Sequence, residues 1–397
     1  MPLPLEGVRI LAVSQYGAGP FGMMHLGDFG ADVIKVEDPA TKGDVARAVP
    51  PFTAGNDSLF FQSLNRNNRS IALDLRSPAG RAVFDDLVRV CDAVFNNLRG
   101  DLPAKLRLDY AGLKHLNPRV VCCSLSGFGK TGPRAAEPGY DYLGQGLAGL
   151  MSITGEPDAP PARFGSPIID FAGGWMAALG TMIALFQSQR TGIGCDVDVA
   201  LLDTALTMLN YMGTYQLNRD FKVERISDSA HPTMVPCQVF PTSDSYVIVM
   251  CLKEKFWQLL CELIDRPELA ADPRFLTFKE RYDHRDELIP ELKSVFRRHT
   301  TAEWLDRLQG QIPCAPVNDV EEALREPQIL ARDMIVSWPH PEFGEVKTIG
   351  NPIKISDAPP RYEAGPAYAA HTDQVLRELL GYSDDRLAEL RAARAVE

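Results

Sequence analysis

The sequence lacks the patterns that mark secreted, zinc-binding and membrane-spanning proteins. Its eight cysteines show no CxxC spacing and mostly lie inside apolar stretches, so we expect reduced core residues rather than a disulfide framework or a zinc site. The start, Met1-Pro2-Leu3-Pro4, has no charged segment followed by an apolar one, and no uninterrupted apolar run reaches membrane-spanning length. These absences predict a soluble, cytoplasmic protein with no membrane partner and no metal ligands.

Basic residues are also in the minority. The 397 residues include 41 Lys and Arg against 52 Asp and Glu, and this net charge of −11 argues against a nucleic-acid partner, which needs a basic face. The charge does not exclude one anionic ligand, for which a few local basic groups suffice. With 45% hydrophobic and 23% charged residues the chain is globular, and its length predicts two domains or one domain with a large insertion.

β-rich runs alternate with helical patterns in the first half of the chain, which predicts an α/β fold with a parallel sheet and crossover helices. We expect strands at residues 8–13, 31–37, 70–75, 93–95, 120–125 and 195–200. Ligands bind outside the carboxyl ends of the strands in such sheets. The glycine-rich stretch 126–133 follows one of these strands but lacks the spacing of a P-loop, so we expect a mobile loop there.

The turn after the first expected strand formally completes a dinucleotide-binding fingerprint. Gly17, Gly19 and Gly22 have the required spacing, and Glu37 ends the second strand about where an acid that binds ribose would stand. The alternative is that these glycines serve only the geometry of a tight turn from strand to helix. On these residues alone an NAD site is one open hypothesis.

A long helical pattern begins at Asp170, which we interpret as the nucleophile of the protein. Free N–H groups and the positive end of the helix dipole stabilise an anion at a helix start, and an ionised carboxylate there can attack an activated acyl group. The nearby Gly173 and Gly174 would let a substrate approach the backbone, whose N–H groups could stabilise an oxyanion. The alternative is that Asp170 only caps the helix.

The pattern changes after residue 200. Residues 201–224 read as an apolar linker helix, and 225–325 as a smaller α+β domain with higher charge density and antiparallel strands near 238–240 and 246–250. We assign residues 1–200 to a large ligand-binding domain and expect residues 326–397 to return to it.

Several stretches together resemble the class III CoA-transferases, the family that includes formyl-CoA transferase, carnitine CoA-transferase and the divergent α-methylacyl-CoA racemase. The matching stretches keep the family's order and spacing nearly end to end. They are residues 5–11, 18–20, 30–37, 65–75, 116–121, 312–317 and 371–372. Because residues 17–22 fall inside the matched region, the resemblance outweighs the NAD hypothesis.

The resemblance implies a large doubly wound, Rossmann-like domain built from both chain ends, plus a small domain, with two subunits interlocked as a homodimer of linked rings. The family's catalytic aspartate stands at Asp170, and coenzyme A, a substrate rather than a permanently bound cofactor, lies across the strand ends. Tyr140 would lie against the adenine. Carried over by position, the CoA contacts are Gly17, Ala18, Leu73 to Arg76, Asn97 to Arg99, Lys105, Gly139 and Tyr140.

Three positions depart from members of that family. Some have glutamine at Gly17, a basic residue at Asp38 and arginine at Lys105, so the phosphate contacts are expected to be rearranged, with Lys42, Arg66 or Arg69 as substitutes. The glycine-rich lid of the formyl-CoA branch is also missing before Tyr246.

The resemblance implies transfer of CoA from an acyl-CoA to a small di- or hydroxy-carboxylic acid, through an aspartyl anhydride and an aspartyl-CoA thioester on Asp170. Arg47, Arg163 and His231 are possible contacts for an acidic acceptor. One alternative is a 2-methylacyl-CoA racemase, which this chain disfavours because Tyr140 stands where that branch has its histidine and is a poor base at neutral pH. A CoA-binding subunit without catalysis is the other alternative.

Overall fold

The computed structural model describes residues 2–397, which form two compact units. The large unit consists of the chain up to Ala148, Gly165–Leu209 and Pro327–Glu397. The small unit consists of Gly149–Phe164 and Asn210–Glu326. Each unit is described below by itself.

A six-stranded parallel sheet forms the centre of the large unit, in the order β5-β2-β1-β6-β7-β8. The strands are β1 (Arg9–Val13), β2 (Asp32–Glu37), β5 (Arg69–Ala72), β6 (Ala93–Asn96), β7 (Val121–Ser126) and β8 (Asp196–Ala200). The expected parallel sheet is confirmed. The strand order reverses between β1 and β6, and such a switch point opens a crevice at the carboxyl ends of the two strands.

Helices and short hairpins surround this sheet. The helices are α1 (Ala18–Gly27), α2 (Leu59–Leu64), α3 (Pro78–Val90), α4 (Leu102–Lys105), α5 (Tyr110–Leu113), α6 (Asp141–Leu147), α7 (Ile168–Thr191), α8 (Leu201–Thr207), α16 (Pro327–Ala331), α17 (Thr372–Leu380) and α18 (Asp384–Ala392). Two hairpins, β3 (Thr53–Ala54) with β4 (Asp57–Ser58) and β12 (Ile335–His340) with β13 (Gly344–Ile349), complete the unit.

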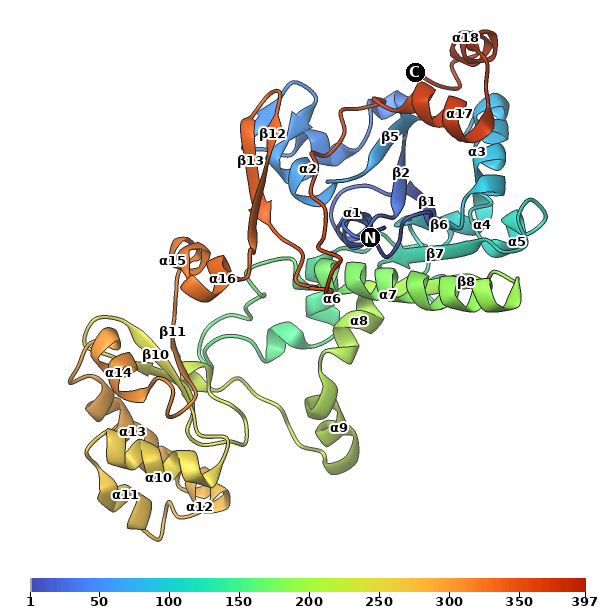
Figure 1. Cartoon of the computed structure of the whole chain (residues 1–397). Coiled ribbons are helices and arrows are strands. Elements are labelled where there is room, and N and C mark those ends of the chain that lie inside the picture. Colours follow the sequence, from blue (N-terminus) through green and yellow to red (C-terminus); the bar gives the residue numbers. More distant parts are fainter. Residues whose placement is uncertain (1) are drawn as a thin grey trace. The chain divides into compact units, whose positions relative to one another are not determined.

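The two ends of the chain share one hydrophobic core. Leu11 of β1 and Ile34 of β2 pack with Leu87 of α3, and the same cluster contains Val375 of α17 and Leu390 of α18. Figure 1 shows α17, in red, beside α3, in blue. The core of the large unit is therefore built from residues near both ends of the chain, which lie more than 300 positions apart in the sequence.

Helix α7 packs against α1 and against β7 and β8. Among the described residues it is the one helix that by length and composition alone could cross a membrane, a test that the core helix of a soluble protein also passes. Its crossing with α1 is very close, because a Cβ atom on Gly174 would lie 2.5 Å from the carbonyl oxygen of Ala18. Only glycine fits at this contact.

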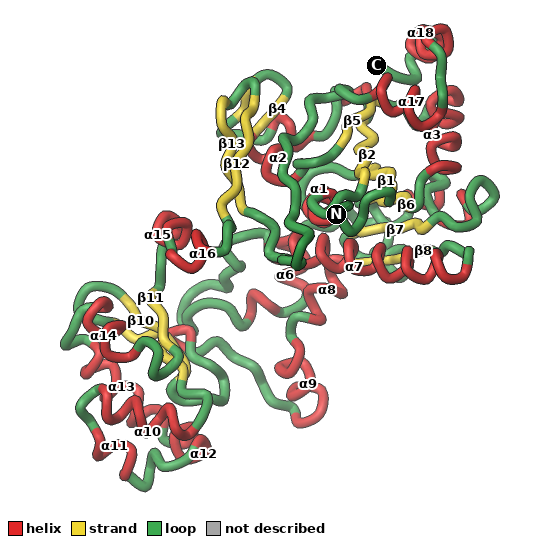
Figure 2. Tube along the Cα trace, in the orientation of Figure 1, coloured by secondary structure: helices red, strands yellow, loops and turns green. Residues whose placement is uncertain are grey.

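The small unit contains an antiparallel sheet in the order β11-β10-β9, covered by helices (Figure 2). Its core includes Trp257, Phe296 and Trp304. The expected apolar helix after residue 200 is two helices, α8 and α9, and the boundary between the units falls between Leu209 and Asn210. The elements are α9 (Asn210–Arg219), β9 (Cys237–Pro241), β10 (Tyr246–Met250), α10 (Glu254–Leu263), α11 (Pro267–Ala271), α12 (Phe278–Asp283), α13 (Arg285–Phe296), α14 (Thr301–Leu308), β11 (Cys314–Pro316) and α15 (Val320–Arg325).

Candidate active site

A pocket of about 510 Å³ opens at the switch point, over the carboxyl ends of β1, β6 and β7. We call it the Asp170 pocket. It brings together seven of the residues expected at the site from sequence. They are Gly17, Ala18, Asn97, Arg99, Gly139, Tyr140 and Asp170.

Asp170 lies in the first turn of α7 and is not the cap of that helix. The cap position is Pro167, which leaves Asp170 as the third helical residue. Its carboxylate has no hydrogen-bond or ion-pair partner among residues 2–397. Burial, and secondarily the negative charge of Asp141, raise the pKa of Asp170 to about 7. Burial therefore opposes the stabilisation of the anion that is expected from the helix start.

Asp141, in the first turn of α6, caps α7 from outside that helix. Its Oδ2 accepts hydrogen bonds from the backbone N–H groups of Ile169 at 2.7 Å and Asp170 at 3.3 Å, and its Oδ1 accepts one from Gln145 Nε2 at 2.5 Å. Asp141 is buried. Sequence reasoning missed this residue, since 29 positions separate it from Asp170 and only its place beside Tyr140 pointed to the site.

Gly17 faces Asp170 across the pocket. A Cβ atom on Gly17 would lie 3.3 Å from Oδ2 of Asp170, so the carboxylate would have to shift by a few tenths of an ångström to admit one. Gly17 is also the N-cap of α1, whose first-turn N–H groups have no partner within the helix. The amino end of α1 therefore offers donors and a positive dipole to an anion in the same pocket.

Gly173 and Gly174 do not offer such donors. Helix α7 begins at Ile168, so the N–H groups of both glycines lie past the first turn and bond within the helix. A Cβ atom on Gly173 would meet the side chain of Leu201 at 2.6 Å. These glycines serve close packing of α7, and the expected oxyanion site at this position is wrong.

The backbone between β1 and α1 is fixed by three side chains. Nζ of Lys35 donates to the carbonyl oxygen of Ser14 at 2.8 Å, and Oδ1 of Asp44 accepts from the N–H of Tyr16 at 2.9 Å. The amide of Asn97 bonds both the N–H of Gln15, at 2.9 Å, and its carbonyl oxygen, at 2.7 Å. Because Lys35 and Asp44 form a buried ion pair at 2.7 Å, the turn that carries Gly17 is anchored in the protein interior.

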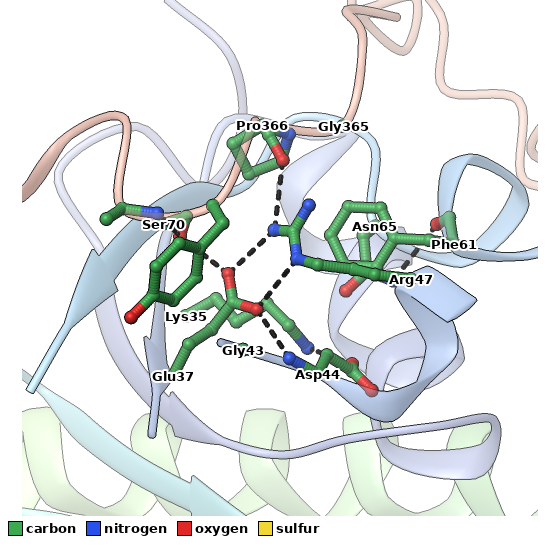
Figure 3. A network of polar contacts seen from close by, with 12 residues as sticks. Lys35, Glu37, Gly43, Asp44, Arg47, Phe61, Asn65, Ser70, Gly365 and Pro366 are labelled. Carbon is green, nitrogen blue, oxygen red and sulfur yellow. Dashed lines mark hydrogen bonds and ion pairs between the residues drawn. The ribbon is translucent and has the colours of Figure 1, made fainter. Parts of the chain in front are cut away.

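Glu37 belongs to the same buried network (Figure 3) and lines a pocket next to the Asp170 pocket rather than the Asp170 pocket itself. Arg47 donates to both of its carboxylate oxygens, at 2.7 and 2.9 Å, and Ser70 Oγ donates at 2.6 Å. Although burial alone would raise it, these bonds and the charge of Lys35 hold the pKa of Glu37 below its ordinary value. The NAD hypothesis thus loses the acid on which it depended.

A second pocket, of about 300 Å³, continues from the first and shares Gln15 and Leu98 with it. We call it the Leu73 pocket. Its walls include Leu73, Leu75 and Leu106, and Arg76 lies at its edge. The contacts expected at Leu73 to Arg76 therefore all line this pocket, beside the Asp170 pocket, whereas Lys105 lines neither of the two.

Arg76, Arg99 and Lys105 are paired with acids. Arg99 and Lys105 both bond to Asp101, at 2.6 Å each, and these two cations hold the pKa of Asp101 well below its usual range. Arg76 contacts Asp38 at 3.1 Å and Asp74 at 3.2 Å. Sequence reasoning missed Asp101, whose spacing from Lys105 by one helical turn was the available signal.

Three of the other basic residues considered from sequence have structural roles. Arg66 is fully buried against Asp28, Arg69 pairs with Asp32 and Glu378, and Arg47 pairs with Glu37, so none of them is free to clamp a phosphate or an acceptor acid. Burial and the charge of Arg285 lower the pKa of His231, whose Nδ1 accepts hydrogen bonds from the backbone N–H groups of Thr233 and Met234. Lys42 is exposed and contacts Glu397.

Among residues 2–397, no group of three or more His, Cys, Asp or Glu side chains could hold a metal ion. What the fold and the pockets define is a doubly wound α/β protein with an unpaired carboxylate at its switch point, next to a long ligand site.

The model of CoA-transferase family III matches residues 5–372, and the chain belongs to that family and is an enzyme of this class. It is 35% identical to succinyl-CoA:glutarate CoA-transferase of Homo sapiens over 99% of this chain and 90% of the relative. It is 35% identical to succinyl-CoA–D-citramalate CoA-transferase of Chloroflexus aurantiacus over 100% of this chain and 98% of the relative. A crystal structure of a CAIB/BAIF family protein from Brucella suis superimposes with a TM-score of 0.82 and 34% identity, covering 96% of this chain and all of that one.

Proposed function

We propose that the enzyme transfers CoA from succinyl-CoA, or a similar acyl-CoA, to a small dicarboxylic acid, with Asp170 as the nucleophile. This proposal rests on the unpaired carboxylate of Asp170, which lies at the head of a pocket that continues along the strand ends. The two relatives' names each combine succinyl-CoA with a dicarboxylate, which supports the substrate class.

The reaction divides into two balanced halves. The ionised Asp170 attacks the thioester carbonyl of the donor, and a C–O bond forms. The C–S bond then breaks, which releases CoA thiolate and gives a mixed anhydride on Asp170. The thiolate then attacks the aspartyl carbonyl, which releases the donor acid and leaves an aspartyl-CoA thioester. The acceptor carboxylate repeats these steps in reverse, so that the acceptor gains CoA and Asp170 is regenerated without water, oxidant or reductant.

The first turn of α1 is the best candidate for stabilising the negative oxygen that develops in each attack. Gly17 and Ala18 line the same pocket as Asp170, and N–H groups at a helix start are fixed donors with a favourable dipole. The proton that holds Asp170 neutral must leave before attack, which makes the reactive fraction depend on pH near 7.

The bound CoA would run from the Asp170 pocket, past Gln15 and Leu98, into the Leu73 pocket. With the thioester at Asp170, the pantetheine arm passes Gly139 and Tyr140, and the adenine lies between the leucines of the second pocket. We therefore reassign Tyr140 from the adenine to the pantetheine end of CoA, because it shares a pocket with Asp170.

The interlocked homodimer is a further part of the proposal. Helix α7 leaves a row of large apolar side chains exposed at helical spacing, and a second copy of the chain is the partner that the family resemblance implies. The row consists of Trp175, Leu179, Ile183 and Phe186. Sedimentation of the protein at micromolar concentration should give twice the mass of one chain; a monomer would reject this part.

The function is tested by incubating the protein with succinyl-CoA and a panel of dicarboxylates and measuring new acyl-CoA thioesters by mass spectrometry. The D170A variant should bind CoA as the wild type does but form no product. Protein quenched during turnover should carry a CoA or acyl adduct on the peptide that contains Asp170. Turnover by D170A would reject Asp170 as the nucleophile.

The same preparation distinguishes the two alternatives. Rapid exchange of the α-proton of a 2-methylacyl-CoA in deuterated water, without any acceptor acid, would favour a racemase. CoA binding with no turnover of any tested donor and acceptor would favour a binding subunit.

A further inference from the structure

A third pocket, of about 610 Å³, adjoins the Leu73 pocket and shares Asp74 and Arg76 with it. We call it the Arg394 pocket. Three arginines line it, namely Arg76, Arg391 and Arg394, together with Asp74, Glu397 and apolar residues. The three pockets thus form one series along the edge of the sheet, with Asp170 at one end and three guanidinium groups at the other.

The C-terminal residues are fixed beside this pocket. The carbonyl oxygen of Ala395 accepts a hydrogen bond from the N–H of Asp74 at 3.0 Å, and Val396 forms an antiparallel bridge with Leu73. Ala395 and Val396 are buried in the core of the large unit. The two residues that follow Arg394 are therefore attached directly to the backbone that lines the Leu73 pocket.

Arg394 also occupies an unusual backbone position. It follows the end of α18 with φ 56°, and the N–H of Ala395 bonds to the carbonyl oxygen of Leu390 at 2.9 Å. Glycine is the usual residue where a helix ends in this left-handed conformation. An arginine here accepts backbone strain, which is consistent with a use for its side chain.

Arg394 differs from its neighbours in charge pairing. Arg76 contacts Asp38 and Asp74, Arg391 pairs with Asp373, and Lys42 pairs with Glu397. The Arg394 side chain has no hydrogen-bond or ion-pair partner among residues 2–397. Arg394 can therefore bind an anion in this pocket without first breaking an ion pair with an acidic side chain.

We propose that Arg394, together with Arg76 and Arg391, binds the 3′-phosphate of CoA and makes the enzyme selective for CoA over dephospho-CoA. This inference rests on the proposed function, which puts the thioester at Asp170 and the adenine between Leu73 and Leu106. The ribose 3′-phosphate then lies next to the adenine, in the Arg394 pocket, whereas the diphosphate lies on the side toward Asp170. Guanidinium groups suit a phosphate dianion because they donate paired, charge-assisted hydrogen bonds.

The test measures the dissociation constants of CoA and of dephospho-CoA by calorimetry, with wild type, R394Q, R394K and R386Q. Arg386 lies on α18, the helix that Arg394 follows; it is exposed and pairs with Glu389 but does not line the pocket, so R386Q is the matched control. Wild type and R386Q should bind CoA about 10- to 100-fold more tightly than dephospho-CoA, as expected for charge-assisted contacts to one phosphate. R394Q should reduce this preference to about threefold or less and leave dephospho-CoA binding unchanged, while R394K should retain part of it.

The outcomes separate this inference from the proposed function. Equal binding of CoA and dephospho-CoA by the wild type, or a full preference in R394Q, would overturn the role of Arg394 even if transfer through Asp170 is confirmed. Loss of dephospho-CoA binding in R394Q would also overturn it, because it would mean general damage to the site. If CoA transfer fails while the phosphate preference and its loss in R394Q are observed, the proposed function fails and the phosphate site stands.

Discussion

The carboxylate of Asp141 caps the helix that carries Asp170: its Oδ2 lies 2.7 Å from the backbone nitrogen of Ile169 and 3.3 Å from that of Asp170. Asp141 thus takes the N–H groups that would otherwise stabilise an anion at the start of α7, and it adds a second negative charge nearby. Burial, and secondarily the charge of Asp141, raise the pKa of Asp170 to about 7, so that it keeps a proton at pH values where an ordinary aspartate is ionised.

The first prediction concerns the pH dependence of catalysis. Because only the carboxylate form of Asp170 attacks a thioester, the rate with saturating acceptor should rise with pH and level off above about 7. The D141N variant keeps an oxygen that can cap α7 but removes the charge, so its rate should level off at lower pH. The measurement is kcat/KM for the acyl-CoA from pH 5 to 9. An unchanged profile in D141N would contradict the electrostatic role of Asp141.

The second prediction concerns stability. Because the pKa of Asp170 is raised to about 7 in the folded state, the folded protein binds more protons than the unfolded chain between about pH 4 and 7. Stability from this group is present at low pH and is lost as pH rises through that window. At pH 8 the free energy of unfolding of the D170N variant should therefore exceed that of wild type by roughly 2 to 4 kcal/mol. At pH 5 the difference should be much smaller. Denaturant unfolding at both pH values measures this difference, and equal stability at pH 8 would argue against a raised pKa.

The third prediction concerns Gly17. A methyl group at this position would lie 3.3 Å from Oδ2 of Asp170, which is too close for an incoming thioester carbonyl to share the space. The G17A variant should lose roughly tenfold or more in kcat, since small misplacements at a reacting centre are costly, with only a small change in CoA affinity. An equal loss in kcat and in affinity would place the effect on binding rather than on the reacting atoms.

The fourth prediction concerns the buried pair of Lys35 and Asp44. Removing one partner leaves an uncompensated buried charge, so D44A should cost about 3 to 5 kcal/mol in the free energy of unfolding. The double variant K35M/D44A removes both charges and should recover part of that loss. Chemical denaturation of wild type, K35M, D44A and the double variant checks this. If the loss of stability in the double variant equals the sum of the losses in the two single variants, the ion pair is not what anchors the turn.

Sequence patterns were sufficient for the parallel sheet, because its strands are short apolar runs separated by clear turns. They also brought Asp170, Gly17 and Tyr140 together, since the family resemblance fixes positions along the chain. They could not show that Glu37 faces Arg47 inside the protein, because an acid at a strand end reads the same whether it meets a ligand or a buried arginine.

The electrostatics of the site could not be predicted from the sequence, for the same reason. The cap on α7 comes from Asp141 on another helix, and the charges of Arg99 and Lys105 meet at Asp101. A pKa depends on burial and on neighbours across the fold. Local sequence at Asp170 indicated a stabilised anion, whereas the assembled structure gives a partly protonated acid.

The Arg47 side chain that neutralises Glu37 also donates to the carbonyl oxygen of Pro366, at 3.0 Å. During synthesis on the ribosome, all six strands of the parallel sheet, which end at Ala200, emerge long before the residues that complete this contact and the core around α17. The large unit therefore has to finish folding late, with its apolar strands exposed in the meantime. Such a chain is expected to depend on chaperones while it is being made.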